Sequence, residues 1–229
     1  NPLGVFAQLI IQMPALRRNG IRLRPRLNLR DPALRETLSI GAPTVLVMLC
    51  SFAIVSVQTA ASYSFSDSGP SVLAYARLWF TLPYAFLAVP ITTTMFTELA
   101  EMQAEGNTQG VKRGIVSGTN QILFFMIPFA LYLMVFAMPL VTLYHAGAFT
   151  MESVGAIASY LAVLAVALPF YGVNTYLQKV YSSVRKMGVF AGFNFVAGGV
   201  QIGLTMLAAS GVGSLPFEAI AAAEAAFYV

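Results

Sequence analysis

The chain has 229 residues, of which 58% are hydrophobic and only 10% are charged, and its mean hydropathy is +0.74. This composition cannot supply a water-facing surface, so a soluble globular domain is excluded. The net charge of +4 does not indicate a nucleic-acid partner, because the basic residues lie in short segments between apolar runs, which is a membrane pattern. The single cysteine, Cys50, excludes an internal disulfide framework and a CxxC metal site.

Long uncharged runs predict an all-α, polytopic transmembrane helix bundle. Crossing the hydrocarbon layer takes about 20 apolar residues in a helix, which also bonds its own backbone polar groups. Five complete spans are predicted, at residues 38–63, 72–97, 116–144, 153–178 and 188–209. Six prolines inside these ranges each remove a backbone donor and favour a kink. They are Pro43, Pro83, Pro90, Pro128, Pro139 and Pro169.

The predicted organisation has four parts. Residues 1–16 are too short to span and resemble the end of a truncated span, and residues 17–36 form a basic cytoplasmic loop. Residues 37–209 form the five-span membrane bundle, and residues 210–229 form a short outer loop and the start of a second truncated span. Since no initiating methionine or signal segment begins the chain, we expect an internal fragment of a longer polytopic protein.

The positions of Lys and Arg predict the orientation. Twelve of the thirteen basic residues fall in alternate connections, at residues 17–35, 98–113 and 179–186, and the intervening connections hold none. Because cytoplasmic loops retain Lys and Arg, these three segments are expected on the cytoplasmic side of the membrane. The arginines of residues 17–35 are either a topology signal only or also bind anionic membrane lipids.

Arg77 is the thirteenth basic residue, and it lies near the start of a predicted span. An arginine at this depth is costly and usually faces the bundle interior or a watery cavity. Snorkelling to the outer interface is the alternative, since a helix starting near Ser71 places Arg77 only about 9 Å inside it. A guanidinium in the interior suits a phosphate-bearing substrate, because its planar fork bonds two oxygens at once.

Amides are the other polar residues of the predicted spans. Asn174 and Gln178 are four residues apart, so they share one helix face, where they either line a path or bond a neighbouring helix. The small-xxx-small spacing that permits close helix approach occurs at Gly188 with Gly192 and at Gly199 with Gly203.

The sequence does not predict an enzyme. The single histidine, His145, has Glu152 as its nearest acid, and no catalytic triad, HExxH, phosphate-binding loop or paired carboxylates are present. We therefore expect no catalytic residues, no metal site and no cofactor.

Several segments together resemble the MviN/MurJ family, the lipid II flippases of peptidoglycan synthesis in the multidrug/oligosaccharidyl-lipid/polysaccharide exporter superfamily. The segments are YARLWFTLPY at residues 75–84, Ala88-Val89 leading to Thr97-Glu98-Leu99, LYHAGAFT at residues 143–150, and Tyr181 before a basic loop and Asn194. The resemblance implies a fourteen-helix transporter of two lobes, of which these spans would be helices seven to eleven. It also implies alternating access, with cavity arginines, Arg77 among them, holding the pyrophosphate of a lipid-linked disaccharide-pentapeptide.

The resemblance further implies a sodium site, which this sequence departs from. Gln58 stands where the family has an acid on helix seven, Asn194 matches its asparagine on helix eleven, and Gly198 stands where a second acid would be. A sodium ion would have no charge partner among these three residues, so we expect no strong ion site here.

The sequence thus predicts part of a transporter that flips lipid II or a similar polyprenyl-pyrophosphate-linked substrate across the cytoplasmic membrane. One alternative is an exporter of another polyprenyl-linked polysaccharide or of a drug in the same superfamily. Another is a non-transporting membrane scaffold that binds cell-wall synthesis proteins. The predicted site residues are Arg77, Asn174 and Gln178 for the substrate, and Gln58 and Asn194 for a degenerate ion site.

Overall fold

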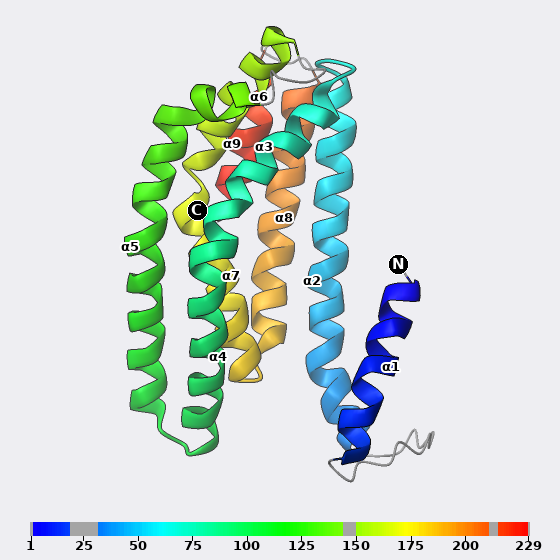
Figure 1. Ribbon diagram of the computed structural model, residues 1–229, viewed down its shortest axis with the longest axis vertical. Helices are drawn as coiled ribbons and strands as arrows, with labels where there is room; N and C mark the ends of the chain where they lie inside the picture. The colour runs from blue at the N-terminus through cyan, green and yellow to red at the C-terminus, as the bar shows by residue number, and fades with distance from the viewer. Residues whose placement is uncertain (1, 19–31, 144–149, 211–214, 229) are drawn as a thin grey trace. The chain divides into compact units, whose positions relative to one another are not determined.

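The computed structural model describes residues 2–18, 32–143, 150–210 and 215–228, and within these ranges it contains helices and turns but no strand (Figure 1). The elements are α1 (Pro2–Arg18), α2 (Pro32–Tyr63), α3 (Gly69–Pro83), the π-helical η1 (Tyr84–Ala88), α4 (Val89–Ala104), α5 (Thr108–Val141), α6 (Met151–Ala165), α7 (Leu168–Ser183), α8 (Met187–Ala209) and α9 (Ala219–Tyr228). The chain divides into two units, Asn1–Leu38 and Ser39–Val229, and the second contains the helical bundle.

The structure confirms the predicted all-α bundle of membrane-spanning helices. Four helical stretches are long and apolar enough to cross a membrane, Gly41–Tyr63, Gly69–Ala104, Thr108–Val141 and Met187–Ala209. The predicted span at 153–178 is instead a pair of helices, α6 and α7, that meet at an angle of 57°. Counting this pair as one bent span gives the five spans that the sequence predicts.

Pro169 explains the bend between α6 and α7. It lies in the first turn of α7, and without an N–H it cannot donate to the carbonyl of Ala165 as a continuous helix requires. The chain instead closes two tight turns, with the Val166 and Ala167 amides donating to the carbonyls three residues earlier at 3.3 and 2.9 Å. The stretch from α3 to α4 bends differently, through the π-helical turn η1 between Pro83 and Pro90.

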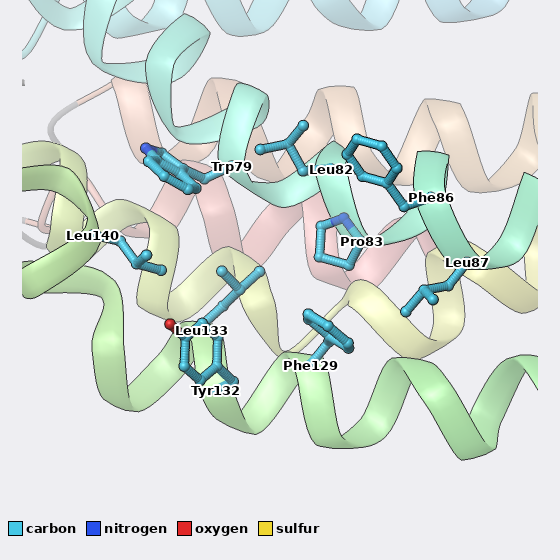
Figure 2. Close-up of a pocket in the computed structure, with 9 residues that line it drawn as sticks. All are labelled: Trp79, Leu82, Pro83, Phe86, Leu87, Phe129, Tyr132, Leu133 and Leu140. Atoms are coloured by element: carbon cyan, nitrogen blue, oxygen red, sulfur yellow. The ribbon is translucent and has the colours of Figure 1, made fainter. Parts of the chain in front are cut away.

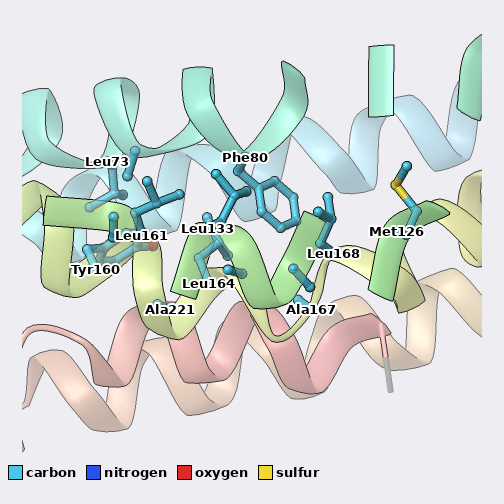
Figure 3. Packing of buried hydrophobic residues seen from close by; sticks show 14 of the residues in the cluster. Leu73, Phe80, Met126, Leu133, Tyr160, Leu161, Leu164, Ala167, Leu168 and Ala221 are labelled. Carbon is cyan, nitrogen blue, oxygen red and sulfur yellow. The ribbon is translucent and has the colours of Figure 1, made fainter. Parts of the chain in front are cut away.

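The bundle core lies between α3, α5, α6, α7 and α9. Figure 3 shows Leu73 and Phe80 of α3 beside Leu133 of α5 and Leu161 and Leu164 of α6, all of them buried. The outer face of α5 is also apolar, since Phe124 and Val135 are 73% and 71% exposed. An exposed apolar face of this kind suits contact with the acyl chains of lipids. Because lipid is as apolar as this face, the helices are held together by close side-chain packing rather than by the hydrophobic effect.

Glycines allow several helices to approach closely, but they are not the glycines that the spacing predicted. A Cβ at Gly172 of α7 would lie 2.8 Å from Ile122 of α5, and one at Gly118 of α5 would overlap the Tyr176 ring. Nothing among the described residues lies within 4 Å of a Cβ built at Gly188, Gly192, Gly199 or Gly203, so the close approach that their spacing permits does not occur there. Spacing fixes a shared face, but only the tertiary structure decides whether another helix covers that face.

Alternate connections lie at the same end of the bundle. Figure 1 shows the turn between α4 and α5 at the same end as the turn between α7 and α8. Lys112 and Arg113 lie near the start of α5, Lys179 lies near the end of α7, and Arg185 and Lys186 lie in the turn that follows α7. The shared end agrees with the orientation expected from the basic residues, and the four-part division of the chain remains a prediction. The middle of the predicted basic loop, residues 19–31, lies outside the described residues.

Candidate functional site

Arg77 lies on α3, eight residues after its first residue, which is about 12 Å along the helix axis. The helix begins at Gly69, earlier than the sequence suggested, so Arg77 is deeper in its span than expected. Its side chain is only 24% exposed, and its neighbours Ala76 and Phe80 are buried. Of the two alternatives, the side chain takes the interior position, because it points toward α2 and α9 and bonds to residues on both.

Three side chains from three helices form a buried polar cluster, which comprises Gln58 of α2, Arg77 of α3 and Glu224 of α9. The Arg77 Nη2 donates to the Glu224 Oε2 at 2.9 Å, an ion pair, and it also donates to the Gln58 Oε1. The Gln58 Nε2 donates to the same Glu224 Oε2 at 3.1 Å. Each member therefore bonds to both of the others.

Burial makes this cluster energetically important. The Glu224 side chain is 9% exposed and Gln58 is 1% exposed, so little water screens the pair. An isolated charge inside a bilayer is costly, and pairing with an opposite charge and an amide dipole offsets that cost. The Arg77 Nε is buried and has no hydrogen-bond partner among the described residues.

A cavity of about 210 Å³ borders the buried polar cluster. Gln58, Arg77 and Glu224 all line it, together with the buried Gln201 of α8. The other lining residues are Ser51, Ile54, Val55, Phe80, Thr81, Tyr171, Phe227 and Tyr228. Ring contacts join Tyr171 to Phe80 and to Tyr228 at centroid distances of 5.3 and 5.2 Å, so one wall is aromatic. The cavity thus combines one cation, one anion and two amides within an apolar surround.

Asn174 and Gln178 lie on α7, and both are half-buried. They continue the helix face that begins with Tyr171, at about 4.5 and 10 Å further along the axis. Neither is among the described residues that line the Arg77 cavity. The structure therefore does not bring them to Arg77, and their role along a path that extends from the cavity stays a prediction.

Gln58 and Asn194 lie in different surroundings. Gln58 belongs to the buried polar cluster, whereas the Asn194 Nδ2 donates to the Phe190 carbonyl at 3.4 Å, within its own helix. The Cys50 thiol donates to the backbone carbonyl of Asn194 at 3.8 Å, and Cys50 is about 12 Å from Gln58 along α2. Gly198 packs there too, since a Cβ built on it would be 2.6 Å from the Cys50 Sγ. The two predicted ion-site residues are therefore not brought together.

Glu224 is a site residue that the sequence did not single out. It falls in the predicted start of a truncated span, whereas the family resemblance concerns acids at the positions of Gln58 and Gly198. A usable signal was present, because Glu224 is an acid within the apolar segment Ala219–Tyr228. An acid and an arginine that both fall in apolar segments are expected to pair, since each is costly in the bilayer alone.

A second and larger cavity, of about 460 Å³, lies between α3, η1 and α5. Figure 2 shows Trp79, Leu82 and Phe86 facing Phe129 and Leu133 across it. None of the described residues that line it is charged, so it offers no countercharge to an ionic headgroup. The Arg77 cavity is the one of these two that carries charged side chains, Arg77 and Glu224.

No group of three or more His, Cys, Asp and Glu side chains that could hold a metal occurs among the described residues. His145 and most of the segment LYHAGAFT lie outside them.

Comparisons with known proteins agree on one family. A family model described as lipid II flippase MurJ matches residues 2–228 of this chain. A "Probable lipid II flippase MurJ" of Borreliella burgdorferi is 22% identical over 183 residues, which are 80% of this chain and 36% of that protein. Another, of Vibrio cholerae, is 25% identical over 153 residues, 66% of this chain and 29% of that protein. The "Lipid II flippase MurJ" of Thermosipho africanus is 27% identical over 114 residues, 49% of this chain and 23% of that protein.

A solved structure shares the fold. The chain matches "Lipid II flippase MurJ, inward closed conformation" with a TM-score of 0.69 and 21% identity, over 88% of this chain and 42% of that chain. The chain thus spans about a third of the length of the curated relatives it matches.

Proposed function

Because the chain belongs to the MurJ family of lipid II flippases, we propose that it forms part of a transporter that moves lipid II across the bacterial cytoplasmic membrane. Its apolar helices and its match to relatives named as flippases support this proposal. The mechanism would be alternating access, in which helices packed around a charged interior expose it to one side of the membrane at a time.

The observation that carries the proposal is the guanidinium of Arg77 inside the bundle, beside a cavity. Lipid II bears a pyrophosphate, and a guanidinium binds phosphate oxygens in pairs through parallel N–H donors. In surroundings of low dielectric constant such a contact is stronger than in water. Arg77 is therefore the proposed contact for the headgroup, and the amides Gln58 and Gln201, which line the same cavity, are proposed to bond further oxygens.

The first test is genetic and uses the full-length protein. Depletion is expected to stop growth and to leave lipid II on the inner leaflet. An Arg77→Ala copy is expected not to restore growth, whereas an Arg113→Ala copy should restore it, because Arg113 is exposed at the end of the bundle. Membrane levels of both variants are measured so that loss of protein is not taken for loss of function.

Other outcomes would favour other functions. Intact lipid II flipping after depletion would contradict the proposal and favour an exporter of another polyprenyl-linked polysaccharide or of a drug. Full growth with Arg77→Ala at normal membrane levels would remove the substrate role of Arg77. Combined with intact flipping, that result would favour a scaffold for cell-wall synthesis proteins.

A further inference from the structure

The guanidinium of Arg77 is only partly used by its protein partners. Within the part of the chain that the structure describes, both of its hydrogen bonds leave from Nη2, and the neighbouring Nε is buried without a partner. Glu224 accepts through the single atom Oε2, so the ion pair is end-on rather than a two-point contact. The side of the guanidinium formed by Nε and Nη2 could bond two oxygens of one anion at once.

Glu224 has a second partner that would remain if Arg77 were taken by another anion. The Gln58 Nε2 donates to the same Oε2 at 3.1 Å, and Gln58 is almost completely buried. A buried carboxylate without any donor is strongly disfavoured, so this bond lowers the cost of separating Glu224 from Arg77. Gln58 also accepts from Arg77, so the amide bonds to both charges.

The cavity beside the cluster gives space for an exchange. It measures about 210 Å³ and is bordered by Arg77, Glu224 and Gln58 together. One water molecule needs about 10 to 15 Å³ of cavity volume. The cavity is therefore large enough for a phosphate group and some of the water molecules that hydrate it.

From these three observations we propose that Glu224 is a built-in competitor for Arg77, which the pyrophosphate of the substrate displaces on binding. This inference rests on the proposed function, and it adds to it a role for Glu224 in substrate release. The displaced carboxylate stays on Gln58, close to the bound anion, and repels it. Glu224 therefore weakens binding and speeds release, which a transporter needs in order to turn over.

A purely structural ion pair makes a different prediction from a competitor. If the pair only holds α3 to α9, loss of the Glu224 charge lowers stability and weakens ligand binding together. If Glu224 competes with the ligand, loss of its charge strengthens binding and slows transport. Binding and turnover therefore move in opposite directions only when Glu224 is a competitor.

The test uses the full-length protein in lipid nanodiscs, with farnesyl pyrophosphate as the probe. Glu224→Gln keeps the shape of the side chain and removes the charge, and we expect its Kd for the probe to fall about tenfold, which corresponds to about 1.4 kcal/mol. The control is Glu101→Gln, which makes the same charge change on an exposed residue of α4 and should leave the Kd unaltered. Transport of labelled lipid II by Glu224→Gln in liposomes should be slower than by the unsubstituted protein.

The remaining outcomes separate this proposal from the proposed function. A Kd for Glu224→Gln that is equal to or weaker than that of the unsubstituted protein, with binding lost in Arg77→Gln, would overturn the competitor role and leave the headgroup role of Arg77 standing. Equal binding, or no binding, by the unsubstituted protein and Arg77→Gln would overturn both.

A second variant keeps the test decisive if Glu224→Gln does not fold. Glu224→Asp keeps the charge but is one methylene shorter, so it should hold Arg77 less well and lower the Kd about threefold, or by about 0.65 kcal/mol. An unchanged or raised Kd in this variant would count against the competitor in the same way.

Discussion

The ion pair between Arg77 and Glu224 is the strongest electrostatic feature of the described residues, and its partners come from α3 and α9, 147 positions apart in the sequence. The cost of either charge alone inside a bundle of apolar helices is high, whereas the cost of the pair is moderate. The effects of removing the two charges should therefore depend on one another.

A double-mutant cycle measures this dependence. Arg77→Gln and Glu224→Gln are each expected to lower the free energy of unfolding by about 3 kcal/mol, because each leaves an uncompensated buried charge. The double variant should lose less than either single variant, since no charge remains unpaired. The measurement is unfolding of the full-length protein in detergent, with Glu101→Gln as a control that should change little. Losses that simply add in the double variant would show that the two charges do not stabilise one another.

The two charges also differ in how far sequence could predict them. Arg77 could be identified because a lone arginine beside an unbroken apolar run is unusual within the chain itself. The acid in an apolar segment favours an ion pair with Arg77, but the sequence pattern does not say which helices face one another, so the contact with Gln58 and the geometry of the cluster could not be predicted. The same limit explains why Gln58 and Asn194, which the family resemblance grouped together, have separate partners.

At the scale of the elements, the turn between α2 and α3 depends on a glycine. A Cβ built at Gly69 would overlap the carbonyl oxygen of Ser62, and backbone atoms there cannot move aside as a side chain could. Gly69 lies at the start of the helix that carries Arg77, so displacement of this turn would also shift the guanidinium.

We therefore expect Gly69→Ala to lower the free energy of unfolding by about 1–3 kcal/mol, as overpacking usually does. Gly155→Ala on α6 is the matched control, because nothing lies within 4 Å of a Cβ built there. That control should be neutral or gain about 0.5–1 kcal/mol from better helix propensity. Thermal unfolding of the two variants side by side checks this, and equal stability of both would show that the turn tolerates a side chain.

Element positions were largely predictable because a helix that crosses lipid needs a long uncharged run. The positions at which a span bends or breaks were harder to predict. Pro169 indicated the bend between α6 and α7, but Pro128 and Pro139 lie within the continuous helix α5. Whether a proline kinks a helix or ends it depends on how neighbouring helices support the freed carbonyl, which is set by tertiary packing.

At the scale of the whole molecule, the alternation of basic and uncharged connections predicts which side each end of the bundle faces. The test replaces Cys50 by alanine and introduces one new cysteine at a time, Ser66→Cys or Gln103→Cys, both at exposed positions. A membrane-impermeant maleimide should label Ser66→Cys in intact cells, whereas Gln103→Cys should require permeabilisation. The opposite pattern would reverse the orientation, and labelling of both in intact cells would contradict the span assignment.

The most direct test of the central claim measures transport itself. Full-length protein, with and without Arg77→Ala, is reconstituted into liposomes, and the movement of labelled lipid II between leaflets is followed over time. The unsubstituted protein and the Arg113→Ala control should move lipid II at similar rates. Arg77→Ala should be slower by at least about tenfold, equivalent to the loss of about 1.4 kcal/mol of interaction. An Arg77→Ala rate equal to that of the unsubstituted protein, at equal reconstitution, would contradict the claim that this buried guanidinium holds the substrate.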